Sequence, residues 1–179
     1  MHAPIRALLC ATALSLGAST ASAEPIRTPG RFGLGLGAGT IANGLSAKYF
    51  VDRQNALQFN LGAFGGRGAD HRWHRFGGFG FSADYLFEMP AIAKAGQAFE
   101  LAWNIGAGLG VGFDDDEYDH KDDHYHDYFA LAASFVLGLE FDLIPIPLDI
   151  VLEFRPGLLL VPYIDLDLVD FTAHIRVYF

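Results

Sequence analysis

The stretch FELAWNIGAGLGVGF, residues 99–113, decides the fold class of this chain. Every odd position in it is apolar, whereas the even positions hold glycine, alanine, Asn104 or Glu100. Successive side chains of a β-strand point to opposite faces, so the alternation predicts a strand with one apolar face and one face of small or polar residues. This pattern is typical of a membrane β-barrel, in which the apolar face contacts lipid and the other face lines the interior.

Seven further segments repeat this alternation. In the last of them, Phe171 and Ile175 fall on the apolar face, while His174 and Arg176 fall on the other. Together with residues 99–113 they predict an all-β fold, an eight-stranded antiparallel up-and-down transmembrane β-barrel. Because the strand number is even, both termini are expected at one end. The seven segments are residues 32–38, 45–51, 57–63, 79–87, 129–141, 148–154 and 171–179, of which 45–51 alternates least clearly.

The N-terminal residues have the features of a secretion signal. Arg6 supplies a positive charge, residues 7–18 are uncharged and mostly apolar, and Ala21-Ser22-Ala23 forms a small-residue cleavage site. We therefore expect a signal peptide at residues 1–23 and an outer-membrane β-barrel domain at residues 24–179. Cys10, the single cysteine, lies in the signal peptide, so the exported domain is expected to contain neither a disulfide nor a thiolate metal site.

Composition favours a barrel over other classes of exported protein. The 179 residues are 51% hydrophobic, yet residues 24–179 contain no run of about 18 apolar residues that would form a membrane helix. A closed β-barrel is the other structure that satisfies every backbone polar group in lipid, which predicts the outer membrane of a Gram-negative bacterium as the location. The formal net charge of −9 makes nucleic acid an unsuitable partner.

The connections between the segments are predicted to alternate between periplasmic turns and outer loops. Pro156 lacks the N–H that a strand pairs, and residues 158–161 are all apolar without alternation, so we expect a β-bulge there. The expected periplasmic turns are residues 52–54, 89–97 and 144–147, and the expected outer loops are residues 40–44, 65–75, 114–127 and 157–165.

The C-terminal segment resembles the assembly signal of bacterial outer-membrane barrels, a final aromatic residue preceded by apolar residues at alternate positions. More widely, most of residues 30–179 looks like a group of small, functionally uncharacterised outer-membrane β-barrel proteins. The matching parts are residues 44–49, 55–57, 83–86 and 147–149, followed by Glu153, Pro156, Pro162 and the final Tyr178-Phe179.

This resemblance implies an eight-stranded barrel like the membrane domain of outer-membrane protein A or like outer-membrane protein X. It also implies a monomer that is surrounded by outer-membrane lipid and inserted by the barrel-assembly machinery. It implies no catalytic activity, and it does not extend to the acidic loop at residues 114–127, which is particular to this chain.

That acidic loop is also rich in histidine, and imidazole combined with carboxylate suits zinc, nickel or copper. Three of its side chains would share one face of an extended segment, which makes the loop a candidate site for a divalent cation. The alternative is a solvated acidic loop without metal, which the lack of EF-hand spacing favours. The candidate ligands are His120, Asp122, His124 and His126.

The alternation also places charged side chains of both signs inside the barrel. An unpaired charge in a narrow interior of low dielectric is costly, so these groups are expected to form a salt-bridged plug. An ion path would need a wider interior than eight strands enclose. The predicted network contains Lys48, Arg155 and Arg176 with Asp84, Glu100, Glu140 and Glu153, and Asp149 falls on the same face.

Inward positions were also tested for a serine hydrolase, which needs a hydroxyl, a histidine and a carboxylate in contact. Ser134, His174 and either Asp170 or Glu153 are the candidates. The lipid A deacylase pattern of histidine and serine two residues apart is absent, because Thr172 and Arg176 flank His174 at that spacing.

We therefore predict a structural or surface-interaction role with an extracellular ligand as partner, no catalytic activity and no cofactor. Binding of a divalent cation through residues 114–127 is the alternative function. A lipid-modifying outer-membrane enzyme is the third hypothesis, which the missing motif disfavours.

Overall fold

The computed structural model describes residues 26–39, 42–64, 78–118, 125–161 and 164–179. These residues form ten strands and no helix. A membrane-spanning helix is therefore not found among them. The strands are β1 (Phe32–Ala38), β2 (Ala42–Phe50), β3 (Asn55–Phe64), β4 (Phe79–Ala95), β5 (Phe99–Tyr118), β6 (Tyr125–Leu143), β7 (Leu148–Phe154), β8 (Gly157–Val161), β9 (Asp165–Asp167) and β10 (Phe171–Tyr178).

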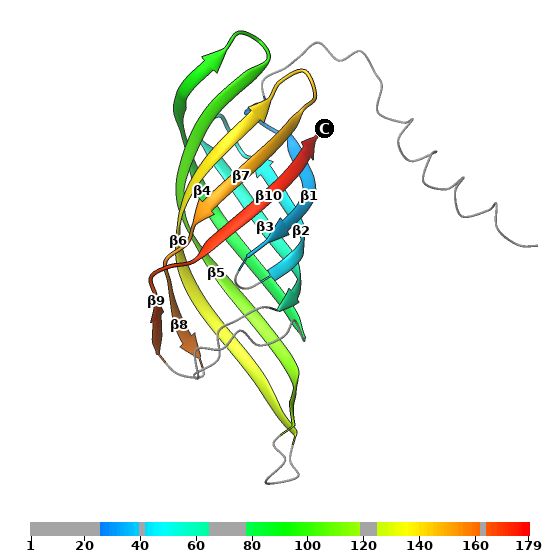
Figure 1. Cartoon of the computed structure of the whole chain (residues 1–179), viewed down its shortest axis with the longest axis vertical. Coiled ribbons are helices and arrows are strands. Elements are labelled where there is room, and N and C mark those ends of the chain that lie inside the picture. The colour runs from blue at the N-terminus through cyan, green and yellow to red at the C-terminus, as the bar shows by residue number, and fades with distance from the viewer. Residues whose placement is uncertain (1–25, 40–41, 65–77, 119–124, 162–163) are drawn as a thin grey trace, which may run out of the picture.

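All strand pairings are antiparallel, and the sheet closes on itself (Figure 1). The first strand pairs with the last, from Gly33 opposite Tyr178 to Ala38 opposite Ala173. β8 continues β7 along the same neighbour, β6, and β9 precedes β10, so the ten strands occupy eight positions around the barrel. The predicted eight-stranded antiparallel barrel is confirmed.

The two faces of the wall follow the predicted alternation. In β10 the side chains alternate strictly between exposed and buried. Leu36 on β1 and Leu152 on β7 point outward and are 61% and 52% exposed, whereas the inward Lys48 and Arg176 are fully buried. The outer surface is therefore apolar and the interior polar, the reverse of a water-soluble protein.

Both described ends of the chain lie at one end of the barrel, which we call the terminal end; the other is the loop end. The N–H of Phe179 donates to the carbonyl of Phe32, and the N–H of Gly30 donates to the carbonyl of Phe50. The three short turns 51–54, 96–98 and 144–147 lie at this terminal end, which is at the top of Figure 1.

Two of the predicted connections, residues 89–97 and 114–127, are partly strand. The expected turn at residues 89–97 is mostly strand, because β4 continues to Ala95 and a register shift between Met89 and Ala93 accommodates Pro90. The actual turn is residues 96–98, where Gly96 adopts a φ of 59°. The expected loop at residues 114–127 is partly strand too, since β5 and β6 remain paired as far as Tyr118 and Tyr125.

The outer connections at residues 40–44 and 157–165 are also shorter than expected. β2 already begins at Ala42, and β8 and β9 occupy most of the second range as a hairpin. The predicted loop at residues 65–75 lies outside the described residues.

The predicted bulge is confirmed within residues 158–161, although Pro156 itself causes no register shift. The pairing register with β6 is the same on both sides of this proline. The proline carbonyl still accepts a hydrogen bond from the N–H of Phe135 at 2.9 Å. The shift occurs within the non-alternating run instead, where Ala132 faces Leu159 and Leu131 faces Val161. Leu160 is thus the extra residue.

Candidate functional site: the charged interior

Six buried carboxylates of the described interior form ion pairs with four cations, of which three are buried and Arg27 is partly exposed. Their ion pairs form three groups that follow one another along the barrel axis. The carboxylates are Asp84, Glu88, Glu140, Asp142, Asp149 and Glu153, and the cations are Arg27, Lys48, Arg155 and Arg176.

The first group lies toward the terminal end and centres on Lys48 of β2. Its ammonium group lies 2.7 Å from Glu88 Oε1 and donates a short hydrogen bond to Glu140, which also accepts one from the Asn104 side chain. Lys48, Glu88 and Glu140 are each almost completely buried. The carboxylates of β4 and β6 are therefore held together across the interior by one amine.

Arg27 supplies the second cation of this group from the segment that precedes β1. Its NH1 group donates to the carbonyl of Met89 at 2.6 Å, and its NH2 group lies 2.9 Å from Glu140 Oε2. Glu88 and Asp142 lie within 3.5 Å and 3.7 Å of the same guanidinium. The N-terminal segment thus enters the end of the barrel and brings charge to the carboxylates there.

The residue before Arg27 closes the same end with an apolar contact. Ile26 is only 2% exposed and belongs to a buried apolar cluster with side chains from five strands. The segment then turns out of the barrel at Gly30, whose φ is 83°. The cluster contains Ile26, Phe50, Ala56, Leu86, Val136 and Tyr178.

The second group centres on Arg176 of β10, which is fully buried. Its guanidinium lies 3.1 Å from Asp149 Oδ2 and donates from NH1 to Gln58 Oε1 at 2.6 Å. The Tyr178 hydroxyl donates to the same aspartate at 2.7 Å. Gln58 then links this group to the next one, because its amide nitrogen donates to Glu153 at 2.9 Å and to Asp84 at 3.2 Å.

The third group centres on Arg155, at the junction of β7 and β8. Its NH1 group donates to Asp84 Oδ2 at 3.0 Å and to Glu153 Oε2 at 3.1 Å, and its NH2 group donates to Ser134 Oγ at 3.2 Å. Glu153 also accepts from the Thr172 hydroxyl at 2.9 Å and lies 3.1 Å from His174 Nε2. The second and third groups are therefore connected to each other through Gln58.

The candidate catalytic residues are separated by these contacts. Ser134 is bonded to Arg155, whereas His174 contacts Glu153 and Thr172, so the serine and the histidine have different partners. Asp170 contributes its backbone carbonyl to the N–H of Arg155. Among these contacts no hydroxyl, imidazole and carboxylate meet at a position open to a substrate, because His174 is 5% exposed and Glu153 is 1% exposed.

Of the charged residues that the sequence placed inside, Glu100 lies apart from the network. It pairs at 2.9 Å with Lys94 of β4, whose side chain is 62% exposed, close to the 96–98 turn. The alternation places Glu100 on the inward face of β5, as predicted. However, Glu100 lies at the terminal end of that strand, beyond the charged groups of the interior. Conversely, Glu88 and Asp142 were missed, although each continues the inward series of its strand by one further step, after Leu86 and after Glu140.

The candidate metal ligands cannot be placed in this way. His120, Asp122 and His124 lie outside the described residues, and His126 is described only by its backbone, which pairs with Glu117. Within the described part of the chain, no group of three or more histidine, cysteine, aspartate or glutamate side chains is arranged to hold a metal ion.

Comparisons with known proteins were made against families, curated sequences and solved structures. No protein-family model matches the chain, and no curated protein matches it. Among solved structures, the chain is similar to the crystal structure of Ail, the attachment invasion locus protein of Yersinia pestis. The two share 12% sequence identity with a TM-score of 0.35, and the match covers 84% of this chain and 97% of that chain. The barrel assignment therefore rests on the strand pairing described above.

Proposed function

We propose that this protein is an outer-membrane β-barrel with a structural and surface-interaction role. The closed sheet satisfies the backbone hydrogen bonds within the wall, which is the condition for a β-structure to reside in lipid. The outward face supplies the matching apolar surface, with exposed leucine, phenylalanine, isoleucine and valine side chains on all eight barrel positions. Apolar surface this extensive would cause a protein in water to aggregate.

The interior supports a structural role over transport or catalysis. Four cations and six carboxylates are cross-linked by direct contacts along the axis, and the largest fully buried side chains fill the interior. These carboxylates and cations contact one another and are almost completely buried, so they are closed to a substrate or a passing ion. A structural wall with interacting outer extensions is the function that fits.

The observation that supports surface interaction most directly is the length of the β5–β6 pair. Below the level at which Phe113 faces Phe129, the two strands have only each other as described neighbours, yet they stay paired to Tyr118 and Tyr125 (Figure 1). We call residues 114–118 and 125–128 the acidic ribbon. Its first strand begins Asp-Asp-Asp-Glu, so the partner it fits is a basic protein surface.

A binding experiment on the barrel in lipid nanodiscs tests this role, with polylysine as the probe. Changing Asp114, Asp115 and Asp116 to asparagine and Glu117 to glutamine is expected to weaken binding about tenfold at low salt, and added salt should abolish binding to the unchanged protein. The control variant carries Asp165→Asn and Asp167→Asn on the β8–β9 hairpin and should bind normally. Equal binding by the ribbon variant and the control would contradict the proposal.

Divalent-metal binding through residues 114–127 is the second candidate function. The pairing of Glu117 with His126 puts a carboxylate position opposite an imidazole position across the two strands. Zinc titration by calorimetry of the refolded barrel tests it, beside a variant with His120, His124 and His126 changed to alanine. Saturable heat that the variant lacks would support zinc binding, and absence of heat from both proteins would exclude it.

A further inference from the structure

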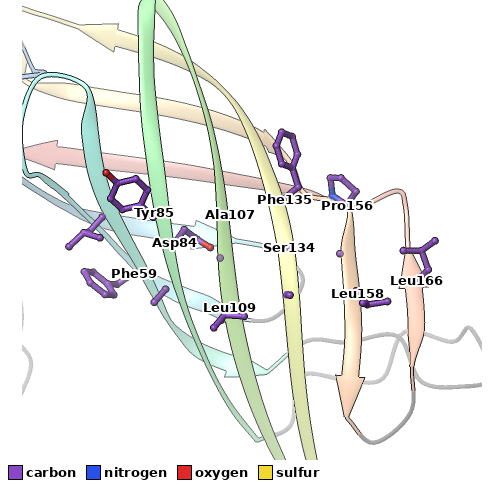
Figure 2. Close-up of a pocket in the computed structure, with 15 residues that line it drawn as sticks. Phe59, Asp84, Tyr85, Ala107, Leu109, Ser134, Phe135, Pro156, Leu158 and Leu166 are labelled. Carbon is purple, nitrogen blue, oxygen red and sulfur yellow. The ribbon is translucent and has the colours of Figure 1, made fainter.

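An open groove of about 710 Å³ crosses the outer face of the wall from β3 to the β8–β9 hairpin (Figure 2). It is much larger than the roughly 300 Å³ at which small-molecule sites begin. Its lining is almost entirely apolar and comes from four neighbouring strands, β3 to β6, and from the hairpin. The main lining residues are Phe59, Ala83, Tyr85, Ala107, Leu109, Ala133, Phe135, Leu158 and Leu166.

The groove exists because three alanines occupy neighbouring outward positions between larger side chains. Strand pairing puts Ala107 between Tyr85 and Phe135 in one row of side chains. In the next row, Leu109 faces Ala83 on one neighbour and Ala133 on the other. The three alanines therefore form the floor of the groove, and the rings of Tyr85 and Phe135 stand on either side of Ala107 (Figure 2).

The β8–β9 hairpin adds a wall that a simple barrel surface lacks. Leu158 of β8 faces Leu166 of β9 across the hairpin, and Leu166 is 60% exposed. Beyond Pro156, β8 pairs with β9 instead of β10, so this wall belongs to a two-stranded piece at the side of the groove. One flank of the groove is thus raised by apolar side chains.

The polar groups beneath the groove are already occupied. Asp84 is 3% exposed and is bonded to Arg155, and the hydroxyl of Ser134 accepts a hydrogen bond from the same arginine. The Tyr85 hydroxyl donates to Asn55 at 2.6 Å. A polar ligand would find no partner here, so the groove fits a hydrocarbon.

We infer that this groove holds one acyl chain of a membrane lipid more tightly than the rest of the barrel surface does. The inference rests on the proposed membrane location, because the groove is continuous with the outward apolar face that lipid would cover. A flexible acyl chain can bend to contact Ala83, Ala107 and Ala133 in turn. A rigid, flat protein surface would not reach these recessed positions. Asp84, the one charged residue in the described lining, is paired with Arg155, so the groove selects the chain and not the headgroup.

Native mass spectrometry of the barrel extracted from lipid nanodiscs tests this inference. The unchanged protein should retain one lipid, with equal occupancy for phosphatidylethanolamine and phosphatidylglycerol of the same acyl chains. Ala107→Phe combined with Ala133→Phe fills the groove and should reduce retention about tenfold. Ala38→Phe with Ala173→Phe is the matched control, since these alanines face each other outside the groove, and should retain the lipid.

A second measurement separates failure of the groove from failure of the membrane location. In a Trp73→Phe background, Trp103 reports contact with lipid through quenching by brominated acyl chains, because it lies on the outward face of β5. Suppose that Trp103 is quenched in all variants, but the unchanged protein retains no lipid or the filled variant retains as much as the unchanged protein. Then the inference about the groove is wrong, and the membrane location stands. Absence of quenching would overturn the membrane location and the groove together.

Discussion

Arg27 is the residue on which the terminal end of the barrel depends most. It faces Glu88, Glu140 and Asp142, and Lys48 is the other cation that contacts this group. Its side chain is 12% exposed, whereas those of Glu88, Glu140 and Asp142 are almost completely buried. A residue outside the strands thereby balances charge that the strands bring together.

Arg27→Ala is expected to reduce the free energy of unfolding by about 3–5 kcal/mol, because it leaves buried carboxylates with too few cations. Urea unfolding of the refolded barrel, followed by heat-dependent gel mobility, measures this change. Adding Asp142→Asn to Arg27→Ala should recover part of the loss. If the double variant is less stable than Arg27→Ala, the charge argument for this end is wrong.

Arg176 offers a comparable test in the middle of the interior. Arg176→Met leaves Asp149 buried with Tyr178 as its remaining hydrogen-bond donor, so a loss of about 3–5 kcal/mol is expected. Arg176→Met with Asp149→Leu removes both charges and should be more stable than Arg176→Met alone. Denaturant titration of the three proteins gives the comparison, and equal stability of both variants would contradict an ion pair here.

At the scale of elements, the turn between β2 and β3 depends on one exposed carboxylate. The Asn55 side chain donates to Asp52 at 2.7 Å, and the N–H groups of Gln54 and Asn55 donate to it at 2.7 and 2.8 Å. These bonds, first the one from the Asn55 side chain, lower the pKa of Asp52 below its usual range. The turn is therefore stabilised by the ionised form.

Because the pKa is lower in the folded state, this contribution is present above the unfolded pKa of about 3.9 and is lost as the pH falls through the folded value. Asp52→Asn should therefore flatten the acid limb of stability below about pH 4 and leave its shape at neutral pH unchanged. Unfolding midpoints measured from pH 2 to 7 test this. An unaltered acid limb would show that another group causes it.

Closure between β1 and β10 depends on the absence of a side chain at Gly35. A Cβ there would lie 2.7 Å from the Arg176 Cα and even closer to the Ile175 carbonyl oxygen, both of which are backbone atoms. Gly35→Ala is thus expected to prevent the compact, heat-modifiable form on gels. Gly157→Ala, whose Cβ would lie 3.2 Å from the Ala133 carbonyl, is the milder control, and normal folding of Gly35→Ala would contradict the pairing.

Sequence reasoning succeeded for elements that cross the apolar wall and failed where a strand leaves it. Residues 99–113 alternate because the outer face and the interior of the wall impose opposite demands on successive side chains. Residues 114–118 are strand as well, but their sequence Asp-Asp-Asp-Glu-Tyr does not alternate, so they were predicted to be loop. Pro90 lies in the predicted turn 89–97, yet β4 continues past it. A register shift between Met89 and Ala93 accommodates the hydrogen bond that the proline cannot make.

The interior contacts could be predicted only in part. Period-two alternation assigns each side chain to a face, but it does not state which strand's charge meets which. The link from Gln58 to Arg176, for example, joins residues 118 positions apart. Arg27 gave no pattern signal, since a segment that folds back into the barrel end has no regular period.

At the scale of the whole molecule, three zones with different chemistry follow one another from inside to outside. A paired polar interior lies within a closed backbone wall, and the wall has an apolar outer face with one groove. The acidic ribbon extends from the loop end, and the N-terminal segment fills the terminal end. Each zone is explained if lipid surrounds the wall and water contacts only the two ends.

Cysteine labelling in intact bacterial cells tests this arrangement most directly, since Cys10 is the single natural cysteine and lies in the expected signal peptide. With a membrane-impermeant maleimide, Tyr118→Cys on the ribbon should react in intact cells, and Arg53→Cys in the 51–54 turn only after permeabilisation. Leu36→Cys on the outward face should react in neither. Labelling of Leu36→Cys as fast as Arg53→Cys in permeabilised cells would contradict a barrel wall covered by lipid.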